Sequence, residues 1–240
     1  MHHVWQYIDS GPNIGAYNMA VDEELLARAQ AGEAVPVLRF YGWDPPAVSL
    51  GRFQHLESAV HAEACRKHGF DIIRRITGGR AVLHHQELTY SIIARADNHL
   101  FPSTVLGTYK VIATGLLAGL KNLGISAEMV SRGGRHATLV EKKPKDPACF
   151  SSPSWYEILV NGKKIVGSAQ RRMKGAFLQH GSILIDYDPR LEAEVISGGC
   201  GVVDVVTCIK RELGRDVPLD VVKQAFVNGF SEELEIEFKV

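Results

Sequence analysis

The strongest pattern in the chain is a helical repeat of apolar residues between positions 103 and 124. Apolar side chains recur there at spacings of three and four, behind Ser103, which we expect to cap the helix. The segment therefore predicts a long helix with one buried face. We expect further helices at 16–32, 56–69 and 218–230, where good helix formers are concentrated. Gly32 and Gly69 would end the first two, and Pro218 suits the first turn of the third.

Runs of apolar residues bounded by turn signals predict strands. They lie at 37–43, 47–54, 72–76, 81–85, 89–95, 176–186 and 235–240. Two further runs flank Asn161-Gly162, which is a strong signal for a hairpin with a two-residue turn. Because helices and strands alternate irregularly, without repeated βαβ units, we expect an α+β fold with a mixed, mostly antiparallel sheet and flanking helices. Residues 1–240 suit a single domain.

The register of this hairpin decides what shares a face with Lys164. A two-residue turn pairs Lys164 with Leu159, and a strand alternates its faces with a period of two. One face then carries Lys164 with Trp155, Glu157, Val166, Ser168 and Gln170. The other, packed face carries Tyr156, Ile158, Ile165, Gly167 and Ala169. We therefore expect Lys164 on a mixed polar surface where it contributes little packing, although a solvated lysine near a hairpin tip is the commoner reading of such a stretch alone.

Charge and cysteine content narrow the class of protein. Lysine plus arginine equal aspartate plus glutamate at 27 each, so the chain lacks a basic footprint and we expect no nucleic-acid partner. No apolar stretch approaches a membrane span, and the first residues lack a signal-peptide pattern, so we expect a cytoplasmic protein without a membrane partner. In a reducing cytosol the four cysteines would be thiols.

Cys149 is the cysteine whose surroundings suggest chemistry. Free cysteines are usually small buried hydrophobes, and Cys65, Cys200 and Cys208 near apolar or helical runs fit that description. Cys149 instead follows KKPKDP and precedes SSPS, where no strand or helix pattern would bury it. Neighbouring cations lower the pKa of a thiol below its free value of about 8.5. A nucleophile is therefore the better interpretation of Cys149.

The segment RRITGGRAVLHH, residues 74–85, is a second candidate site. Its two glycines let backbone amides approach an anion or an acyl carbonyl closely, although a tight turn is the commoner role of a Gly-Gly pair. A strand follows the loop, which excludes the Walker and dinucleotide fingerprints. His84 and His85 point to opposite faces of a strand, and no zinc-ligand spacing occurs, so we expect no metal site.

Several segments, in their order along the chain, carry a resemblance to a known family. They are YNMAVDEELL, VLRFYGWDPPAVSLGRFQ, RRITGGRAVLHHQELTYSI, ACFSSPSWYEI and GKKIVGSAQRR followed by LQHGSILID. Together they span most of the chain. The sequence resembles the lipoate-protein ligase A and octanoyltransferase family, and most closely its LipM-type octanoyltransferases. His85 departs from the pattern, because many relatives have aspartate there, and its role stays open.

The resemblance implies a biotin/lipoyl ligase-like catalytic fold and a specific reaction. An octanoyl group would pass from the phosphopantetheine thioester of acyl carrier protein to a lysine of a lipoyl-accepting protein, such as the glycine cleavage H protein or an E2 lipoyl domain. Cys149 would accept the acyl group, and Lys164 would be the essential lysine of the K-x-x-G-S-A motif. The substrate-binding set would be Arg75, Thr77, Gly78, Gly79, Arg80, His84, Gly167, Ser168 and Ala169.

The reactivity of thiols and amines agrees with these roles. Exchange of one thioester for another is nearly balanced in energy, so Cys149 needs neither ATP nor another cofactor to accept the acyl group. Lys164 would favour the thiolate and then carry a proton from the incoming amine. Carrier recognition would use basic surface residues, because acyl carrier proteins are acidic.

Three other functions are compatible with parts of the sequence. They are an ATP-dependent lipoate ligase, an amidotransferase that moves octanoyl between lipoyl-accepting proteins, and a non-catalytic module that binds carrier proteins or fatty acids. The ligase is disfavoured by Cys149 and by Arg80, where ligases usually have a third glycine. The non-catalytic module is disfavoured by the presence of both Cys149 and Lys164.

Overall fold

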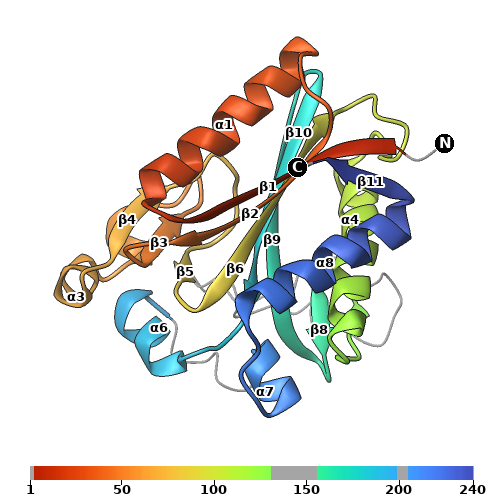
Figure 1. Ribbon diagram of the computed structural model, residues 1–240. Coiled ribbons are helices and arrows are strands. Elements are labelled where there is room, and N and C mark those ends of the chain that lie inside the picture. The colour runs from red at the N-terminus through yellow and green to blue at the C-terminus, as the bar shows by residue number, and fades with distance from the viewer. Residues whose placement is uncertain (1–2, 131–155, 199–204, 240) are drawn as a thin grey trace.

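A computed structural model describes residues 3–130, 156–198 and 205–239, and an eight-stranded sheet forms its centre (Figure 1). The strand order is β11-β1-β2-β6-β10-β9-β8-β7. The strands are β1 (His3–Asn13), β2 (Val37–Trp43), β6 (Glu87–Arg95), β7 (Glu128–Met129), β8 (Ile158–Val160), β9 (Lys163–Met173), β10 (Ala176–Leu184) and β11 (Ile236–Lys239). β1 runs parallel to β11 and β2, and every other neighbouring pair is antiparallel. The predicted mixed, mostly antiparallel sheet in an α+β fold is thus confirmed.

A second, three-stranded sheet lies beside the first. It contains β4 (Asp71–Arg74), β3 (Ala47–Leu50) and β5 (Val82–His84), and it packs with the short helices α2 (Leu56–Ala59), α3 (Ala62–His68) and α6 (Pro189–Val195). The helix expected at 56–69 is interrupted at Val60, whose backbone is extended and forms a bridge to Ile196. The strand expected at 47–54 ends at Leu50, where the chain turns.

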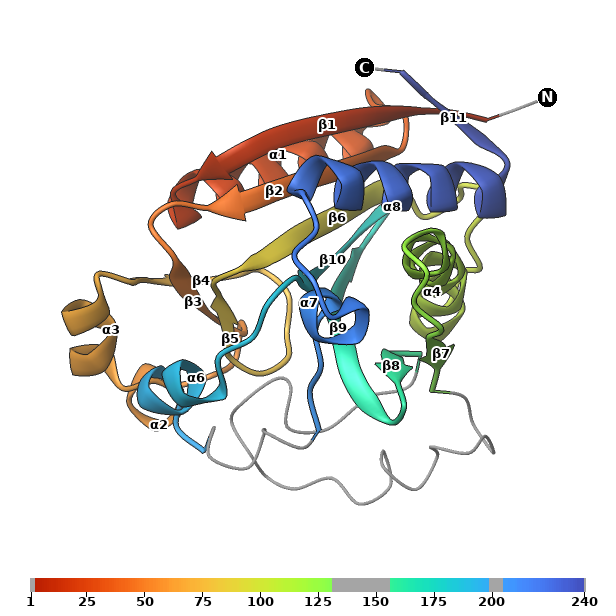
Figure 2. The ribbon, with the colours of Figure 1, turned by 60° about the horizontal axis from the view of Figure 1, so that its bottom comes forward.

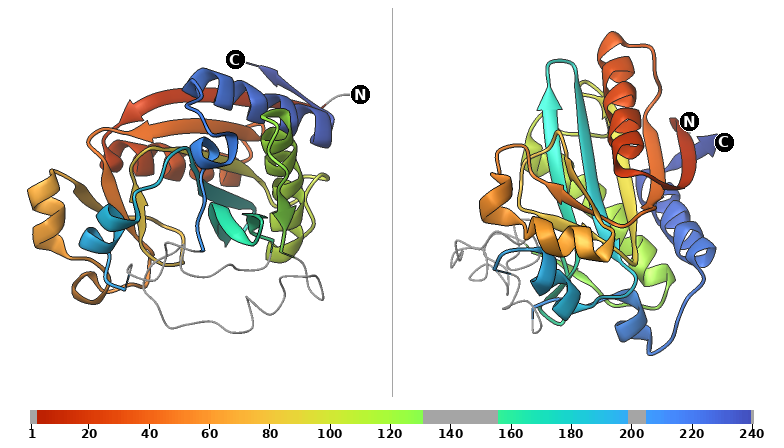
Figure 3. Two further views of the ribbon diagram at one scale, coloured as in Figure 1. Left: turned by 90° about the horizontal axis from the view of Figure 1, so that it is seen from below. Right: turned by 90° about the vertical axis from the view of Figure 1, so that its left-hand side faces the viewer.

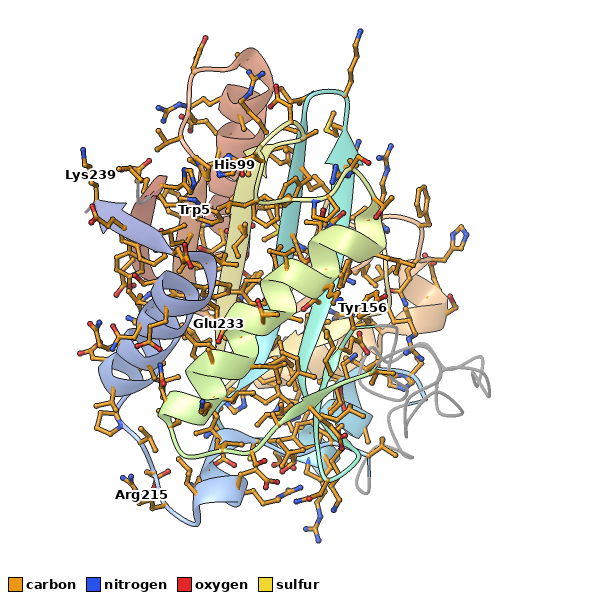
Figure 4. The ribbon with its side chains drawn as sticks, turned by 90° about the vertical axis from the view of Figure 1, so that its right-hand side faces the viewer. Trp5, His99, Tyr156, Arg215, Glu233 and Lys239 are labelled. Atoms are coloured by element: carbon orange, nitrogen blue, oxygen red, sulfur yellow. The ribbon has the colours of Figure 1, made fainter. Side chains whose placement is uncertain are left out.

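Helices cover both faces of the main sheet. α4 (Val105–Asn122) and α8 (Leu219–Leu234) lie on one face, and α1 (Gly15–Ala31) lies on the other (Figures 2 and 3). α4 crosses the sheet beside α8, which carries Glu233 (Figure 4). The side chain of Thr104, rather than the expected Ser103, caps α4 by accepting a hydrogen bond from the Gly107 amide. The predicted long helix is otherwise confirmed.

Strict alternation along β2, β6 and β10 gives the main sheet one apolar face, which packs on α4 and α8. The other face changes character along the strands. Under the C-terminal half of α1 it is apolar, with Val37, Ile93 and Leu178 in one cluster. Two residue pairs further along, the same face carries Arg39, Ser91 and His180, and four pairs further along it carries Tyr41, Thr89 and Ser182. These residues form a polar row on an otherwise buried sheet face. Buried polar side chains of this kind are typical of a functional site.

Four elements have no counterpart among the sequence-based predictions. They are β1, β7, α6 and α7 (Ile209–Leu213), each short or lacking a clean apolar period. Within the described part of the chain, no helix combines the length and apolar character needed to cross a bilayer.

Candidate active site

The hairpin that carries Lys164 has a bulge that changes which face the lysine occupies. Lys164 pairs with Leu159, as expected, but Ile158 pairs with Val166, so one extra residue of β9 lies between these two pairs. A bulge of one residue reverses the alternation of faces beyond it. Lys164 therefore shares its face with Gly167 and Ala169, and the expectation that it shares one with Val166 and Ser168 is wrong.

Lys164 is also not on a polar surface. Its side chain is 1% exposed, and its Nζ lies 2.8 Å from Oε1 of Glu157, which is 4% exposed. The backbone of Lys164 is held as well, because its amide donates to Val205 O and its carbonyl accepts from the Thr207 amide. The expected contact with Glu157 is confirmed, whereas the expectation that Lys164 contributes little to packing is wrong. The ammonium group is held in a defined place at the edge of the polar row.

A pocket opens where the polar face of the main sheet meets the second sheet. It measures about 370 Å3, its open mouth included. The lining comes from α1, both sheets and the loop after β4, and it comprises Met19, Tyr41, Trp43, Ser49, Arg75, Val82, His84, Thr89, Gly167, Ser168, Ala169, His180, Gly181 and Ser182. Of the residues predicted to bind substrate, Arg75, His84, Gly167, Ser168 and Ala169 are thus brought together. The small residues Gly167 and Ala169 of β9 form part of one wall of this pocket.

The floor of the pocket rests on Asp22 of α1, which is 1% exposed. Arg39 Nη1 pairs with its Oδ1 at 2.8 Å, and Tyr41 and Ser91 donate to the same carboxylate. Burial alone would raise the pKa of Asp22, but the hydrogen bond and charge of His180 and the charge of Arg39 outweigh it and hold the pKa below its ordinary value. Asp22 is therefore a fixed anion beneath the pocket.

His180 connects this anion to the loop after β4. Its Nδ1 lies 3.2 Å from Asp22 Oδ2, and its Nε2 lies 2.7 Å from Thr77 Oγ1. Arg75 Nε donates to the same hydroxyl. His180 thus bridges the Asp22 carboxylate and the Thr77 hydroxyl.

A second chain of hydrogen bonds starts from Nη1 of Arg75. Arg75 Nη1 donates to Ser49 Oγ, which lies 2.8 Å from His84 Nε2, and His84 Nδ1 lies 3.3 Å from Glu87 Oε1. Burial lowers the pKa of His84 despite the opposing effect of Glu87, so the ring is neutral. Both imidazoles thus have a hydroxyl near Nε2 and a carboxylate near Nδ1.

Arg75 also shapes the loop 77–80, because its Nη2 donates to the carbonyls of Gly78 and Arg80. Gly79 has a φ of +91°, which favours glycine, and a Cβ built there would lie 3.9 Å from the Cβ of Ala169. The loop is therefore held over the β9 end of the pocket. The guanidinium of Arg75, a residue of the predicted substrate-binding set, donates hydrogen bonds that hold the loop in shape.

Ser182 Oγ, in the pocket lining, is a buried oxygen without a hydrogen-bond partner among the described residues. Glu87 Oε2, outside the lining, is another. Ser182 pairs with Gly167 across β10 and β9, in the row nearest Lys164. A buried hydroxyl without a partner is costly, and a substrate carbonyl would satisfy it.

The structure separates the cysteines into two groups. Burial raises the pKa of the Cys65 and Cys208 thiols, which makes both poor nucleophiles. Cys149 and Cys200 lie outside the described residues. Cys149 precedes Glu157 by eight positions, and the described chain resumes at Tyr156, whose amide donates to Val130 O.

Sequence reasoning missed Asp22, Arg39, His180 and Ser182. Each is a polar residue at a position where the surrounding apolar pattern predicts a buried side chain, as in VLRFYGW or LQHGSILID. A buried polar residue needs partners, so this break in the pattern was the available signal. Among the described residues no grouping of three or more His, Cys, Asp or Glu side chains is placed to hold a metal ion.

Comparison with known proteins agrees with this geometry. Residues 15–231 match the family model of the lipoyl protein ligase A/B catalytic domain. A protein named octanoyltransferase LipM from Brevibacillus brevis is 43% identical over 242 residues, which are 97% of this chain and 88% of that protein. The protein of the same name from Bacillus subtilis is 39% identical over 244 residues, covering 98% and 88%.

Solved structures show the same fold. A lipoate-protein ligase A bound with ATP superposes with a TM-score of 0.78 at 27% identity and covers 100% of this chain and 88% of that one. A bi-partite lipoate protein ligase from Thermoplasma acidophilum superposes with a TM-score of 0.79 at 25% identity, covering 99% and 86%. The resemblance seen in the motifs is confirmed, and the chain belongs to the lipoyl protein ligase A/B catalytic domain family.

Proposed function

We propose that the protein is an acyltransferase that moves an octanoyl group from octanoyl-acyl carrier protein to the acceptor lysine of a lipoyl-dependent protein, without ATP or another cofactor. The observation that carries the proposal is the pocket itself, in which the predicted residues of β9 and of the loop after β4 meet beside the buried Lys164. The relatives named octanoyltransferase, at 38–43% identity, support the choice of acyl group.

The acyl chain would lie in the pocket between β9 and the second sheet. Gly167 and Ala169 give it room, and Met19 and Val82 offer apolar contacts. The carbonyl would lie toward the Ser182 hydroxyl, which then gains a partner. A hydrogen bond to a carbonyl oxygen that gains negative charge lowers the barrier to attack on the carbonyl.

In the first step the Cys149 thiolate attacks the carbonyl of the carrier thioester. A new carbon–sulfur bond forms to Cys149, the bond to the pantetheine sulfur breaks, and the leaving thiolate takes a proton. The Lys164 ammonium, oriented by Glu157, favours the attacking thiolate and supplies that proton.

In the second step the amine of the acceptor lysine attacks the acyl-Cys149 carbonyl. An amide bond forms, the carbon–sulfur bond breaks, and Cys149 regains its thiol. The proton lost by the attacking amine goes to Lys164, and Lys164 gives a proton to the departing sulfur. Amide formation from a thioester runs downhill, so the sequence of steps is complete without ATP.

The test is transfer from octanoyl-acyl carrier protein to a lipoyl-accepting domain, read as the mass of the acceptor, with Cys149→Ser as the control. We expect octanoylation without ATP by the wild type and none by the variant. A requirement for ATP with free octanoate or lipoate would instead identify a ligase. Transfer from an octanoylated lipoyl domain, but not from the carrier, would identify an amidotransferase, and no transfer at all would leave a binding module.

A further inference from the structure

One side chain near the pocket is exposed in a way that packing does not explain. Phe53 is 80% exposed, and it stands at the tip of a turn formed by residues 51–54. The guanidinium carbon of Arg52, which is also exposed, lies 5.4 Å from the centre of the Phe53 ring. A single exposed apolar residue is common, so the turn has meaning only if other features of the molecule point to a partner.

The turn is held in a fixed shape. Arg74 Nη1 donates to the carbonyl oxygens of Gly51, Arg52 and Gln54, and the Gln54 side chain accepts from the Gly51 amide. The amide of Gln54 also donates to Gly51 O, closing the turn. Arg74 thus fixes the backbone that carries the exposed Phe53. A turn that is already ordered loses less conformational entropy when a partner covers it.

The turn lies directly against the loop after β4, whose first residue, Arg75, lines the pocket. The Arg52 amide donates to Thr77 O at 2.9 Å. A Cβ built on Gly51 would lie 2.0 Å from Gly79 O, so the two loops touch backbone to backbone. A partner that covers Phe53 would therefore rest at the rim of the pocket, within reach of its interior.

The turn and the loop against it carry only basic charged residues, although Asp44, Glu57, Asp71 and Glu87 flank the two segments in the sequence. Residues 46–56 and 72–86 contain Arg52, Arg74, Arg75 and Arg80 and no aspartate or glutamate, although the whole chain has equal numbers of basic and acidic residues. Arg75 is buried, and the other three are at least partly accessible. This local excess of positive charge selects an anionic partner.

We propose that the turn of residues 51–54 is the docking element for the acyl-carrying donor protein, with Phe53 as the apolar anchor and Arg52 as the charged contact. The inference rests on the proposed function. The donor is acidic, and its prosthetic arm brings a phosphodiester to the rim of the pocket, whereas the acceptor brings a cationic lysine that the arginines would repel. The turn therefore belongs to the first half of the reaction.

The test compares two donors of the same acyl group, octanoyl-acyl carrier protein and octanoyl-pantetheine, which lacks both the protein and the phosphate. The variants are Arg52→Glu and Phe53→Ala. Arg66→Glu is the matched control, because Arg66 is a basic residue of α3 with a side chain 72% exposed. Loss of a central contact changes affinity on the order of tenfold or more. We expect both variants to raise KM for the carrier protein by about tenfold, and the effect of Arg52→Glu to shrink with added salt.

Transfer from octanoyl-pantetheine and KM for the acceptor should stay at the wild-type value, and Arg66→Glu should change neither donor. Equal losses with both donors would overturn the proposal, because the turn would then shape the pocket rather than dock a protein. An unchanged KM for the carrier, or a rise confined to the acceptor, would also overturn it. A wild-type enzyme that transfers octanoyl from neither donor would contradict the proposed function itself, before any variant is compared.

Discussion

Replacement of Lys164 by methionine separates its structural role from its chemical one. Methionine fills most of the volume of Lys164 but leaves the Glu157 carboxylate, 4% exposed, without the ammonium 2.8 Å away. Removal of one partner from a buried ion pair costs about 3–5 kcal/mol. A protein of this size changes its melting temperature by about 2–4 °C per kcal/mol, so Lys164→Met should melt about 6–20 °C below the wild type.

The assay is a double-mutant cycle by urea unfolding and calorimetry, run beside octanoyl transfer. Glu157→Gln in the Lys164→Met background removes the unpaired charge and should restore most of the lost stability while transfer stays abolished. Lys163→Met, at the half-buried neighbouring position, should change stability by less than about 0.5 kcal/mol and keep transfer. Wild-type stability in Lys164→Met, or a double variant no more stable than the single one, would refute the reasoning from the buried pair.

Three further predictions follow from the pocket. His180→Gln should lower kcat/KM for transfer by tenfold or more and stability by about 1–3 kcal/mol, because the hydrogen bonds that link Asp22 to Thr77 are lost. An unchanged kcat/KM would show that these bonds do not position the loop 77–80. Burial lowers the pKa of His84, so only the unfolded chain binds its proton near pH 6.5. Stability should be full above that pH and fall below it, and urea unfolding between pH 5 and 7.5 should show a flatter profile for His84→Gln; equal slopes would contradict the assignment of a neutral ring. Hexanoyl donor should be about tenfold less efficient than octanoyl, because two methylenes contribute up to about 1.6 kcal/mol, and we expect palmitoyl to be too long for the pocket. Efficiency that rises steadily with chain length would instead indicate an open groove.

The architecture was accessible from sequence because its buried strands alternate cleanly. In β2, β6 and β10 every second residue faces α4 and α8, and the helix stops at Gly32 and Gly69 lie where the pattern places them. β1 escaped prediction because its mixed polar and apolar residues and its Gly11-Pro12 end leave no regular alternation. β1 is a strand because it pairs with β2 and β11. The local pattern of apolar residues does not predict pairing between segments so far apart in the chain.

The site was accessible only in part. The motif positions Arg75, His84 and Gly167 were found where the pocket is, but the face of Lys164 was not, because one bulged residue reverses a strand's alternation and leaves no mark in the sequence pattern. The partners of Lys164 and His180 come from elements far apart in the chain. Their contacts depend on how two sheets pack, which no window of a single sequence contains.

The proposed mechanism requires a covalent acyl intermediate at Cys149. This intermediate is tested by measuring the mass of the protein after mixing it with octanoyl-acyl carrier protein alone. We expect a gain of one octanoyl group, removed by hydroxylamine and located on the peptide that contains Cys149. The gain should be absent in Cys149→Ser and should disappear from the wild type when a lipoyl-accepting domain is added. No gain with an active wild-type enzyme, or a gain located on Cys65, Cys200 or Cys208, would contradict the proposed mechanism.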